Sequence, residues 1–327
     1  MTRYPSWKKH GIKKDGKNIL AVFILIVLVF AIANGITKSF SIKKYFSQSE
    51  WDSKSPFVGV LTTSPSSIFI FQKDPKRLAV FKLDENSYLA TGEKSHLKKT
   101  AEIFLDDDNE KTARILSYNL GVDIEKYVTL NQKVPADAES VRNIFKNYAS
   151  FVTPFKIAAG GYDFGIKDTN ITRIDLLKLW WQVKGLSVEN VKLTDLQEYK
   201  EEIITADNKK VLGVEEESIR LLMGEYLENR YLDQKNIDIE IINGSKVLAA
   251  GDLAADFAAS FGFQVTNLEQ STDLSQQTKI IADDKGSYNV SYLAQIFDCD
   301  IVTGQNEAKD GKITVVIGRD FALRYFE

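Results

Sequence analysis

Apolar and polar positions alternate most regularly near the end of the chain. Residues 237–243 alternate apolar with charged or polar side chains, which is typical of a half-buried β-strand, and Gly244 predicts a tight turn after it. An alanine-rich stretch follows, in which large apolar side chains recur every four residues and predict a helix with a narrow apolar face: Leu253, Phe257 and Phe261. Gly262 predicts the end of that helix, and residues 313–321 predict a last strand.

Shorter apolar runs separated by polar turns fill the middle of the chain. They predict strands at residues 56–61, 68–71, 78–83, 127–130 and 188–193. Apolar spacing and capping residues predict helices at residues 138–148, 172–181 and 215–231, and one more that starts after Asp106-Asp107-Asp108 and stops at Gly121. The expected fold class is therefore mixed α/β.

Two adjacent tryptophans lie on the helix expected at residues 172–181. Trp180 and Trp181 point about 100° apart on a helix, so they cannot share one face. We expect one of them in the core and the other in a lid or interface contact.

Residues 19–36 form an apolar run of eighteen residues without a charge. As a helix, at about 1.5 Å per residue, this run is just long enough to cross a hydrocarbon core. Six basic residues precede it and three lysines follow, so we expect a cytoplasmic leader at residues 1–18 and an extracytoplasmic body. Residues 37–56 predict a juxtamembrane stalk with Trp51 near the membrane interface.

A cleaved signal peptide is the competing interpretation of the same run. Ala31-Ile32-Ala33 has the small-x-small pattern at which peptidases cut, so cleavage after Ala33 stays open. The retained anchor is favoured, because the apolar run continues to this site without the short polar region that usually precedes cleavage.

Composition supports folded cores and narrows the function classes. The chain has 327 residues, 44% of them hydrophobic, so one larger and one smaller domain are expected. The formal charge is −3, and subtracting +5 for residues 1–18 and +3 for Lys38, Lys43 and Lys44 leaves −11 for residues 45–327. A body this acidic is a poor match for a phosphate backbone, so no nucleic-acid partner is expected.

Few residues of the types that bind metals are present. Cys299 is the only cysteine, which excludes an intramolecular disulfide and a multi-cysteine metal site. Besides His10 in the leader there is only His96, whose lysine-rich surroundings indicate a solvated surface. We therefore predict no metal, no cofactor and no catalytic residue.

The C-terminal region resembles a known domain. Its most specific segments are Ile241-Ile242-Asn243-Gly244-Ser245 and Val315-Val316-Ile317-Gly318-Arg319-Asp320-Phe321. They resemble the C-terminal domain of LytR-type cell-envelope proteins, expected here over residues 236–327, after a boundary at 232–236. The resemblance implies a place in the envelope and no assigned activity. Candidate ligand contacts are Asn243, Gly244, Ser245, Arg319 and Asp320; for the last two, a local ion pair is the favoured alternative.

Earlier segments resemble, in order, pieces of the LytR-CpsA-Psr (LCP) catalytic domain, which is expected over residues 57–232. The segments begin at Ser67, Lys73, Arg77, Leu120 and Thr169. That family transfers lipid-linked glycopolymers onto peptidoglycan. The second strand of the family's domain ends in the motif Ser-Ile-Pro-Arg-Asp-Thr-Tyr, whose Arg and Asp belong to the site for the pyrophosphate and its magnesium. At the corresponding positions this chain has Glu85 in place of the Arg and Asn86 in place of the Asp. Ser66 stands in place of an earlier Asp.

These departures predict a region that keeps the LCP fold and has lost the family's catalytic activity. Phosphoryl transfer depends on positioning and on cations, and Glu85 reverses the charge beside a pyrophosphate. The family's later Arg-rich segment, expected between residues 134 and 168, has only Arg142. The expected function is a membrane-anchored, non-catalytic envelope protein that binds cell-wall glycopolymer or an envelope protein through its C-terminal domain. The alternative is a divergent glycopolymer phosphotransferase or pyrophosphatase with displaced clamps: Arg77, Arg114 and Arg173.

Overall fold

The computed structural model describes residues 49–91, 96–106, 108–159, 165–205, 208–233, 238–303 and 313–326. Residues Glu50–Glu327 form one compact unit, separate from Met1–Ser49. The span expected at residues 19–36 and the leader before it lie outside the described residues. Among the residues that are described, no helix is long and apolar enough to cross a membrane.

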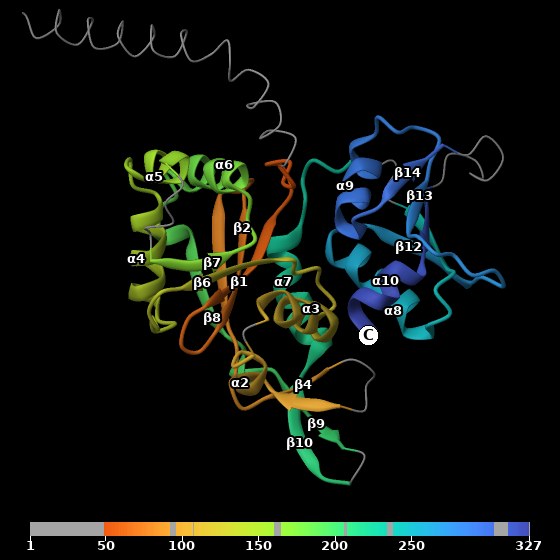
Figure 1. Ribbon diagram of the computed structural model, residues 1–327, viewed down its shortest axis with the longest axis horizontal. Helices are drawn as coiled ribbons and strands as arrows, with labels where there is room; N and C mark the ends of the chain where they lie inside the picture. Colours follow the sequence, from red (N-terminus) through yellow and green to blue (C-terminus); the bar gives the residue numbers. More distant parts are fainter. Residues whose placement is uncertain are drawn as a thin grey trace, which may run out of the picture. The chain divides into compact units, whose positions relative to one another are not determined.

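A six-stranded sheet organises the larger part of the body (Figure 1). Its strand order is β7-β6-β1-β2-β3-β8. The strands are β1 (Phe57–Thr62), β2 (Ser67–Gln72), β3 (Arg77–Lys82), β6 (Lys126–Leu130), β7 (Ile166–Thr169) and β8 (Val191–Asp195). Strands β1, β2 and β3 are antiparallel neighbours, whereas β6 and β8 pair in parallel with β1 and β3. Every position of β2 is buried, which is why its residues 68–71 form a continuous apolar run.

A small second sheet has the order β5-β4-β10-β9 and was not expected from the sequence. It consists of β4 (Tyr88–Ala90), β5 (Leu97–Lys99), β9 (Lys200–Ile204) and β10 (Lys210–Val214). Strands β4 and β5 are too short for a hydrophobic period, and β9 begins with three charged residues. Pairing with neighbours, rather than apolar alternation, makes these segments extended.

The C-terminal region forms a third sheet with the order β12-β11-β15-β13-β14. Its strands are β11 (Asp238–Asn243), β12 (Gln264–Gln270), β13 (Lys279–Ile281), β14 (Asp300–Val302) and β15 (Ile313–Ile317). The last strand ends at Ile317, so the expectation of a strand to residue 321 is wrong. A Cβ at Gly318 would lie 2.3 Å from the Gln277 carbonyl carbon, so only glycine allows this close backbone approach before a final helix begins at Arg319.

Helices pack around the three sheets and confirm the mixed α/β class. They are α2 (Thr100–Ile103), α3 (Asn109–Leu120), α4 (Ala138–Tyr148), α5 (Thr153–Ala159), α6 (Arg173–Val183), α7 (Glu216–Leu227), α8 (Leu248–Ser260), α9 (Tyr288–Phe297) and α10 (Arg319–Phe326), with 3-10 turns at Val188–Asn190 and Leu196–Glu198. As expected, Asp108 caps α3 by accepting from the Lys111 N–H, and Gly121 ends it at φ +61°.

Helix α7 is shorter than the sequence indicates. It ends at Leu227 instead of residue 231, because the Asn229 carboxamide oxygen accepts the Tyr231 N–H at 3.1 Å and the Asn229 amide nitrogen donates to the Tyr288 hydroxyl. Side chains that bind nearby backbone in this way compete with helical hydrogen bonds.

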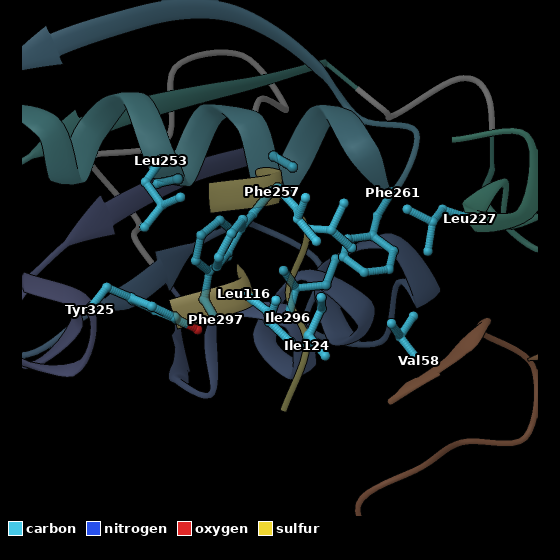
Figure 2. Packing of buried hydrophobic residues seen from close by; sticks show 14 of the residues in the cluster. Val58, Leu116, Ile124, Leu227, Leu253, Phe257, Phe261, Ile296, Phe297 and Tyr325 are labelled. Carbon is cyan, nitrogen blue, oxygen red and sulfur yellow. The ribbon is translucent and has the colours of Figure 1, made fainter. Parts of the chain in front are cut away.

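One continuous hydrophobic core joins the first and third sheets. The expected apolar face of α8 is confirmed, because Leu253, Phe257 and Phe261 are all at most 5% exposed. Figure 2 shows Phe257 and Phe261 near Leu116 of α3, within the same cluster. Burying one such phenylalanine contributes roughly 1.5–3 kcal/mol. The two regions therefore share packing instead of meeting through polar surfaces alone.

The start of the described chain is part of this body. Trp51 is 3% exposed and its ring centroid lies 5.0 Å from that of Phe57, so the expected position of Trp51 at the membrane interface is wrong. The buried Asp175 carboxylate on α6 accepts the backbone N–H groups of Glu50 at 2.9 Å and Trp51 at 3.3 Å. The end of the expected stalk is thereby fixed to α6.

Candidate functional site

A cleft of about 670 Å³ lies where the first sheet region meets the C-terminal helices. One wall comes from Glu50, the beginning of β1, helix α3 and the segment 123–126 that enters β6. The other wall comes from Phe261 at the end of α8 and from α9 and α10. The polar and charged lining side chains are Glu50, Ser55, Glu110, Arg114, Asp123, Glu125, Lys126, Asn170, Tyr292, Gln295, Asp298, Arg324 and Tyr325.

Charges of alternating sign form a continuous line across the cleft. Lys126 pairs with Glu50 and, at 3.8 Å, with Glu125. Arg324 of α10 pairs with Glu125 at 3.5 Å and with Asp298 at 3.1 Å. The Arg324 side chain is only 23% exposed, so solvent screens these contacts less than it screens ordinary surface pairs. Through Arg324 the C-terminal region is linked electrostatically to the first one.

Asp123 is the most perturbed acid of the cleft. Its carboxylate accepts a hydrogen bond from the Tyr325 hydroxyl at 3.3 Å. Burial first, and then the neighbouring Glu125 carboxylate, raise the pKa of Asp123 well above its ordinary value. Burial also raises the pKa of Glu125, against the opposing effect of Lys126 and Arg324. The pair therefore holds protons more tightly than exposed acids do.

Asn170 fixes the backbone that presents these acids. Its amide nitrogen donates to the Glu125 carbonyl at 2.8 Å, and its carboxamide oxygen accepts the Tyr127 N–H at 3.0 Å. Asn170 precedes α6, whose first turn is capped by Thr172 through the Asp175 N–H. The position of Glu125 is thus set by the same region that fixes the start of the body.

Two side chains of α9 line the same wall of the cleft. Tyr292 is 3% exposed and its hydroxyl is buried, so its ring, and not its hydroxyl, meets the cleft. Burial raises the pKa of Tyr292, so its hydroxyl stays a hydrogen-bond donor. Gln295 is half-buried one helical turn further along the same wall.

A second, shallower groove beside α3 is strongly acidic. It is lined by Asp106, Asp108, Asn109, Glu110, Lys111, Tyr127 and Asp168. Burial, followed by the Asp168 carboxylate, raises the pKa of Tyr127 to about 12. Within the described part of the chain, no group of three or more His, Cys, Asp or Glu side chains has an arrangement that would hold a metal ion.

The positions that the sequence resemblance assigns to the LCP pyrophosphate site lie at one end of the β2–β3 pair, because Ser66 directly precedes β2 and Glu85 and Asn86 follow β3. Glu85 and Asn86 occupy an exposed turn after β3, and the Ser66 carbonyl accepts the Leu83 N–H at 2.9 Å. The neighbouring acid is Asp84, which pairs with Lys200 at 2.6 Å. Although burial opposes it, the hydrogen bond from Lys200 lowers the pKa of Asp84. Lys200 is thus neutralised by Asp84.

The three arginines considered as displaced clamps do not line one cavity. Arg77 stacks on the Tyr226 ring at 4.5 Å and donates to Gln72. Arg173 is exposed in the first turn of α6. Only Arg114 lines the large cleft, where it pairs with Glu110 at 3.6 Å.

The predicted contacts at residues 243–245 hold the turn between β11 and α8. The Asn243 carboxamide oxygen accepts the Ser245 hydroxyl at 2.7 Å, and its amide nitrogen donates to the Val247 carbonyl at 2.8 Å. Gly244 donates its N–H to the Ile317 carbonyl, and a Cβ there would lie 2.9 Å from the Ser275 Cβ. Asn243 and Ser245 are at most 4% exposed, and all three residues lie outside both cavities.

The predicted contacts at Arg319 and Asp320 lie at the start of α10 and not in the cleft. The Asp320 carboxylate accepts the Thr278 N–H at 2.8 Å, the Thr278 hydroxyl at 2.7 Å and the Phe321 N–H at 2.8 Å. Arg319 is exposed. The favoured alternative of a local ion pair is wrong, because Thr278 donors occupy the carboxylate.

Apart from Arg114, the charged residues that line the cleft were not predicted from the sequence. One signal was present: residues 122–125 alternate Val122 and Ile124, both buried, with Asp123 and Glu125, which places both acids on the opposite face. The approach of Arg324, 202 residues beyond Val122, has no signal in a single sequence.

Comparisons with known proteins agree with the C-terminal assignment. Residues 236–321 match the family model described as LytR cell envelope-related transcriptional attenuator. No match was found among curated proteins.

Several solved structures are distantly similar to this chain. Bacillus subtilis TagV is 13% identical with a TM-score of 0.37, over 53% of this chain and 98% of that chain. A structure of TagT bound to LI-WTA is 10% identical with a TM-score of 0.36, over 55% and 92%. Lin1025 from Listeria innocua is 9% identical with a TM-score of 0.35, over 53% and 97%. These similarities are too distant to transfer an activity. The chain thus carries a C-terminal domain, over residues 236–321, that matches the LytR cell envelope-related family model.

Proposed function

We propose that this chain is a membrane-anchored, non-catalytic protein of the bacterial cell envelope that binds a cell-wall glycopolymer. The binding site is the cleft between the LCP-like region and the LytR-type C-terminal domain. The observation that carries the proposal is the joint lining of this cleft, in which α9 and α10 supply one wall and the segment 123–126 supplies the other. Binding there uses the C-terminal domain without requiring a reaction.

The lining favours a hydroxyl-rich ligand over a phosphate-rich one. Five carboxylates and three cations line the cleft: Glu50, Glu110, Asp123, Glu125 and Asp298 against Arg114, Lys126 and Arg324. A polyphosphate would meet net negative charge there, whereas sugar hydroxyls can both donate to carboxylates and accept from the Gln295 amide.

The absence of catalysis is supported by the residues at the former pyrophosphate turn. Glu85 and Asn86 offer an acid and an amide where the LCP family uses an arginine and an acid, and Lys200 is already paired with Asp84. Loss of one cation that stabilises a transferring phosphoryl group costs several kcal/mol of transition-state stabilisation. Arg114 alone does not restore such a clamp.

Retention of purified wall polymers by the full chain in detergent tests the proposal. We expect peptidoglycan-derived glycans to be retained, and Gln295→Ala to weaken their binding by about tenfold, because a ligand hydrogen bond in the cleft is lost. The matched control Gln264→Ala, exposed at the beginning of β12, leaves binding unchanged. Retention of phosphate-rich polymer alone overturns the charge argument. Retention of no polymer, with capture of an envelope protein instead, makes a protein partner the ligand.

A further inference from the structure

Four large apolar side chains around α5 and α6 are turned to solvent. Phe151 is 71% exposed, Val152 52%, Phe155 63% and Trp181 66%. Phe151 and Val152 lie in the turn before α5, and Trp181 lies on α6, which packs beside α5 (Figure 1). We call these four residues the aromatic patch. A clustered apolar surface of this kind marks an interaction site more often than scattered exposed residues do.

Lys184 lies beside rings from two parts of the aromatic patch, the turn before α5 and helix α6. The Lys184 ammonium lies 5.9 Å from the Phe151 ring centroid and 5.9 Å from that of Trp181. The Phe151 and Phe155 ring centroids are 5.8 Å apart. Lys76 donates to the Lys184 carbonyl at 3.4 Å, which places a second ammonium beside the same edge. Large rings edged by lysines are the composition of membrane-interface surfaces, because rings enter the headgroup layer and ammonium groups meet lipid phosphates.

Trp180 shows why the neighbouring ring is exposed. Trp180 is 8% exposed and donates its indole N–H to the Ser150 carbonyl, which holds the turn before α5 against α6. The adjacent Trp181 must then point away from the core. The sequence predicted one ring of this pair in the core and the other in a lid or interface contact. Trp180 confirms the first part, and Trp181 is the exposed ring.

The start of the body is attached to the same helix. Asp175 on α6 binds the backbone of Glu50 and Trp51 and lies six residues before Trp181, about 9 Å along the helix. Twelve residues separate the apolar run at 19–36 from Ser49, which reach at most about 40 Å when fully extended. The proposed function, in which the apolar run spans the membrane, therefore allows no more than about 40 Å of chain between the bilayer and the start of the body.

We propose that the aromatic patch contacts the surface of an anionic lipid bilayer. The inference takes the membrane-anchored location from the proposed function and is independent of polymer binding. Phe151, Phe155 and Trp181 insert among headgroups, and Lys184 pairs with lipid phosphates. The contact holds the body in one orientation on the membrane.

An environment-sensitive fluorophore on a single cysteine reports this contact. In a Cys299→Ala background, Val152→Cys labels the edge of the patch, and Leu221→Cys, at 72% exposure on α7, is the matched control. The full chain is placed in nanodiscs of phosphatidylglycerol or of phosphatidylcholine, and it is also added to preformed vesicles of each lipid. We expect the label at position 152 to become about twofold brighter and to be quenched by spin-labelled lipid in the anionic membranes, while the label at 221 stays aqueous.

Substitutions in the aromatic patch distinguish direct lipid contact of the patch from mere proximity to the membrane through the anchor. Trp181→Ser combined with Phe155→Ser should return the label at 152 to its aqueous emission, and Lys184→Glu should do so in the anionic lipid. Aqueous emission of the 152 label in anionic nanodiscs and vesicles, equal to that of the 221 label, overturns the inference. Loss of polymer retention with the lipid signal intact contradicts only the proposed function.

Discussion

The Tyr325 hydroxyl donates a hydrogen bond of 3.3 Å to the Asp123 carboxylate. It connects the last helix of the chain to the loop that leads from α3 into β6. Beside it, Arg324 bridges Glu125 and Asp298. The cleft is therefore closed on one side by contacts that depend on protonation and charge.

Replacing Asp123 by Asn should change how stability depends on pH. The ordinary pKa of this carboxyl is 3.8, and burial raises it in the folded state. Above 3.8 the folded state then binds more protons than the unfolded state, so the free energy of unfolding falls as pH rises through this window. Asp123→Asn keeps an acceptor for Tyr325 without the ionisation, and we expect it to be more stable at neutral pH by about 1 kcal/mol.

Urea unfolding between pH 4 and pH 8 measures this effect. A smaller slope should remain in Asp123→Asn, because Glu125 titrates in the same direction with Lys126, Arg324 and Tyr325 around it. Asp283→Asn, an exposed acid of the same region, should keep the full slope. Equal pH dependence of the wild type and Asp123→Asn would show that burial does not perturb this acid.

Removing the Arg324 guanidinium should weaken the link between the two regions. Arg324→Ala leaves Glu125 half-buried with Lys126 as its remaining cation, and we expect a loss of about 1–2 kcal/mol in the free energy of unfolding. Arg319→Ala on the exposed first turn of the same helix should cost under about 0.5 kcal/mol. Hydrogen exchange at residues 123–126 should rise only in Arg324→Ala, and equal exchange in both variants argues against the bridge.

Asp320 should act as a structural cap and not as a ligand contact. Asp320→Ala leaves the Thr278 and Phe321 N–H groups without their acceptor, which costs about 1–2 kcal/mol and lowers the melting temperature. Asp273→Ala, exposed in a nearby loop, serves as the control. Unchanged stability together with weakened polymer binding would restore Asp320 as a binding residue.

The local pattern of apolar positions predicted those helices and strands whose apolar faces pack into the hydrophobic core. The period of Leu253, Phe257 and Phe261 and the Asp108 and Gly121 boundaries of α3 are local signals, and each is confirmed. The sheet of β4, β5, β9 and β10 has no such signal, because β4 and β5 are three residues long and β9 begins with three charged residues. Its two local pairs, β4–β5 and β9–β10, are joined through Tyr88 and Gly213, which lie far apart in the chain.

The candidate site was largely beyond sequence reasoning for the same reason. Asn243, Ser245 and Asp320 are polar residues at turns, and their side chains are used by neighbouring backbone. The cleft arises only when Arg324 and Tyr325 reach residues 123–125 across the fold. A single sequence carries no information on that approach.

Phosphate release from a polyprenyl diphosphate with magnesium tests the central claim most directly. The full chain, with Glu85 and Asn86 at the turn after β3, should release no phosphate above the rate without protein while it retains wall glycan. Release at a rate that Arg114→Ala abolishes would contradict the account, since the one arginine of the three that lines the cleft would then be serving a reaction.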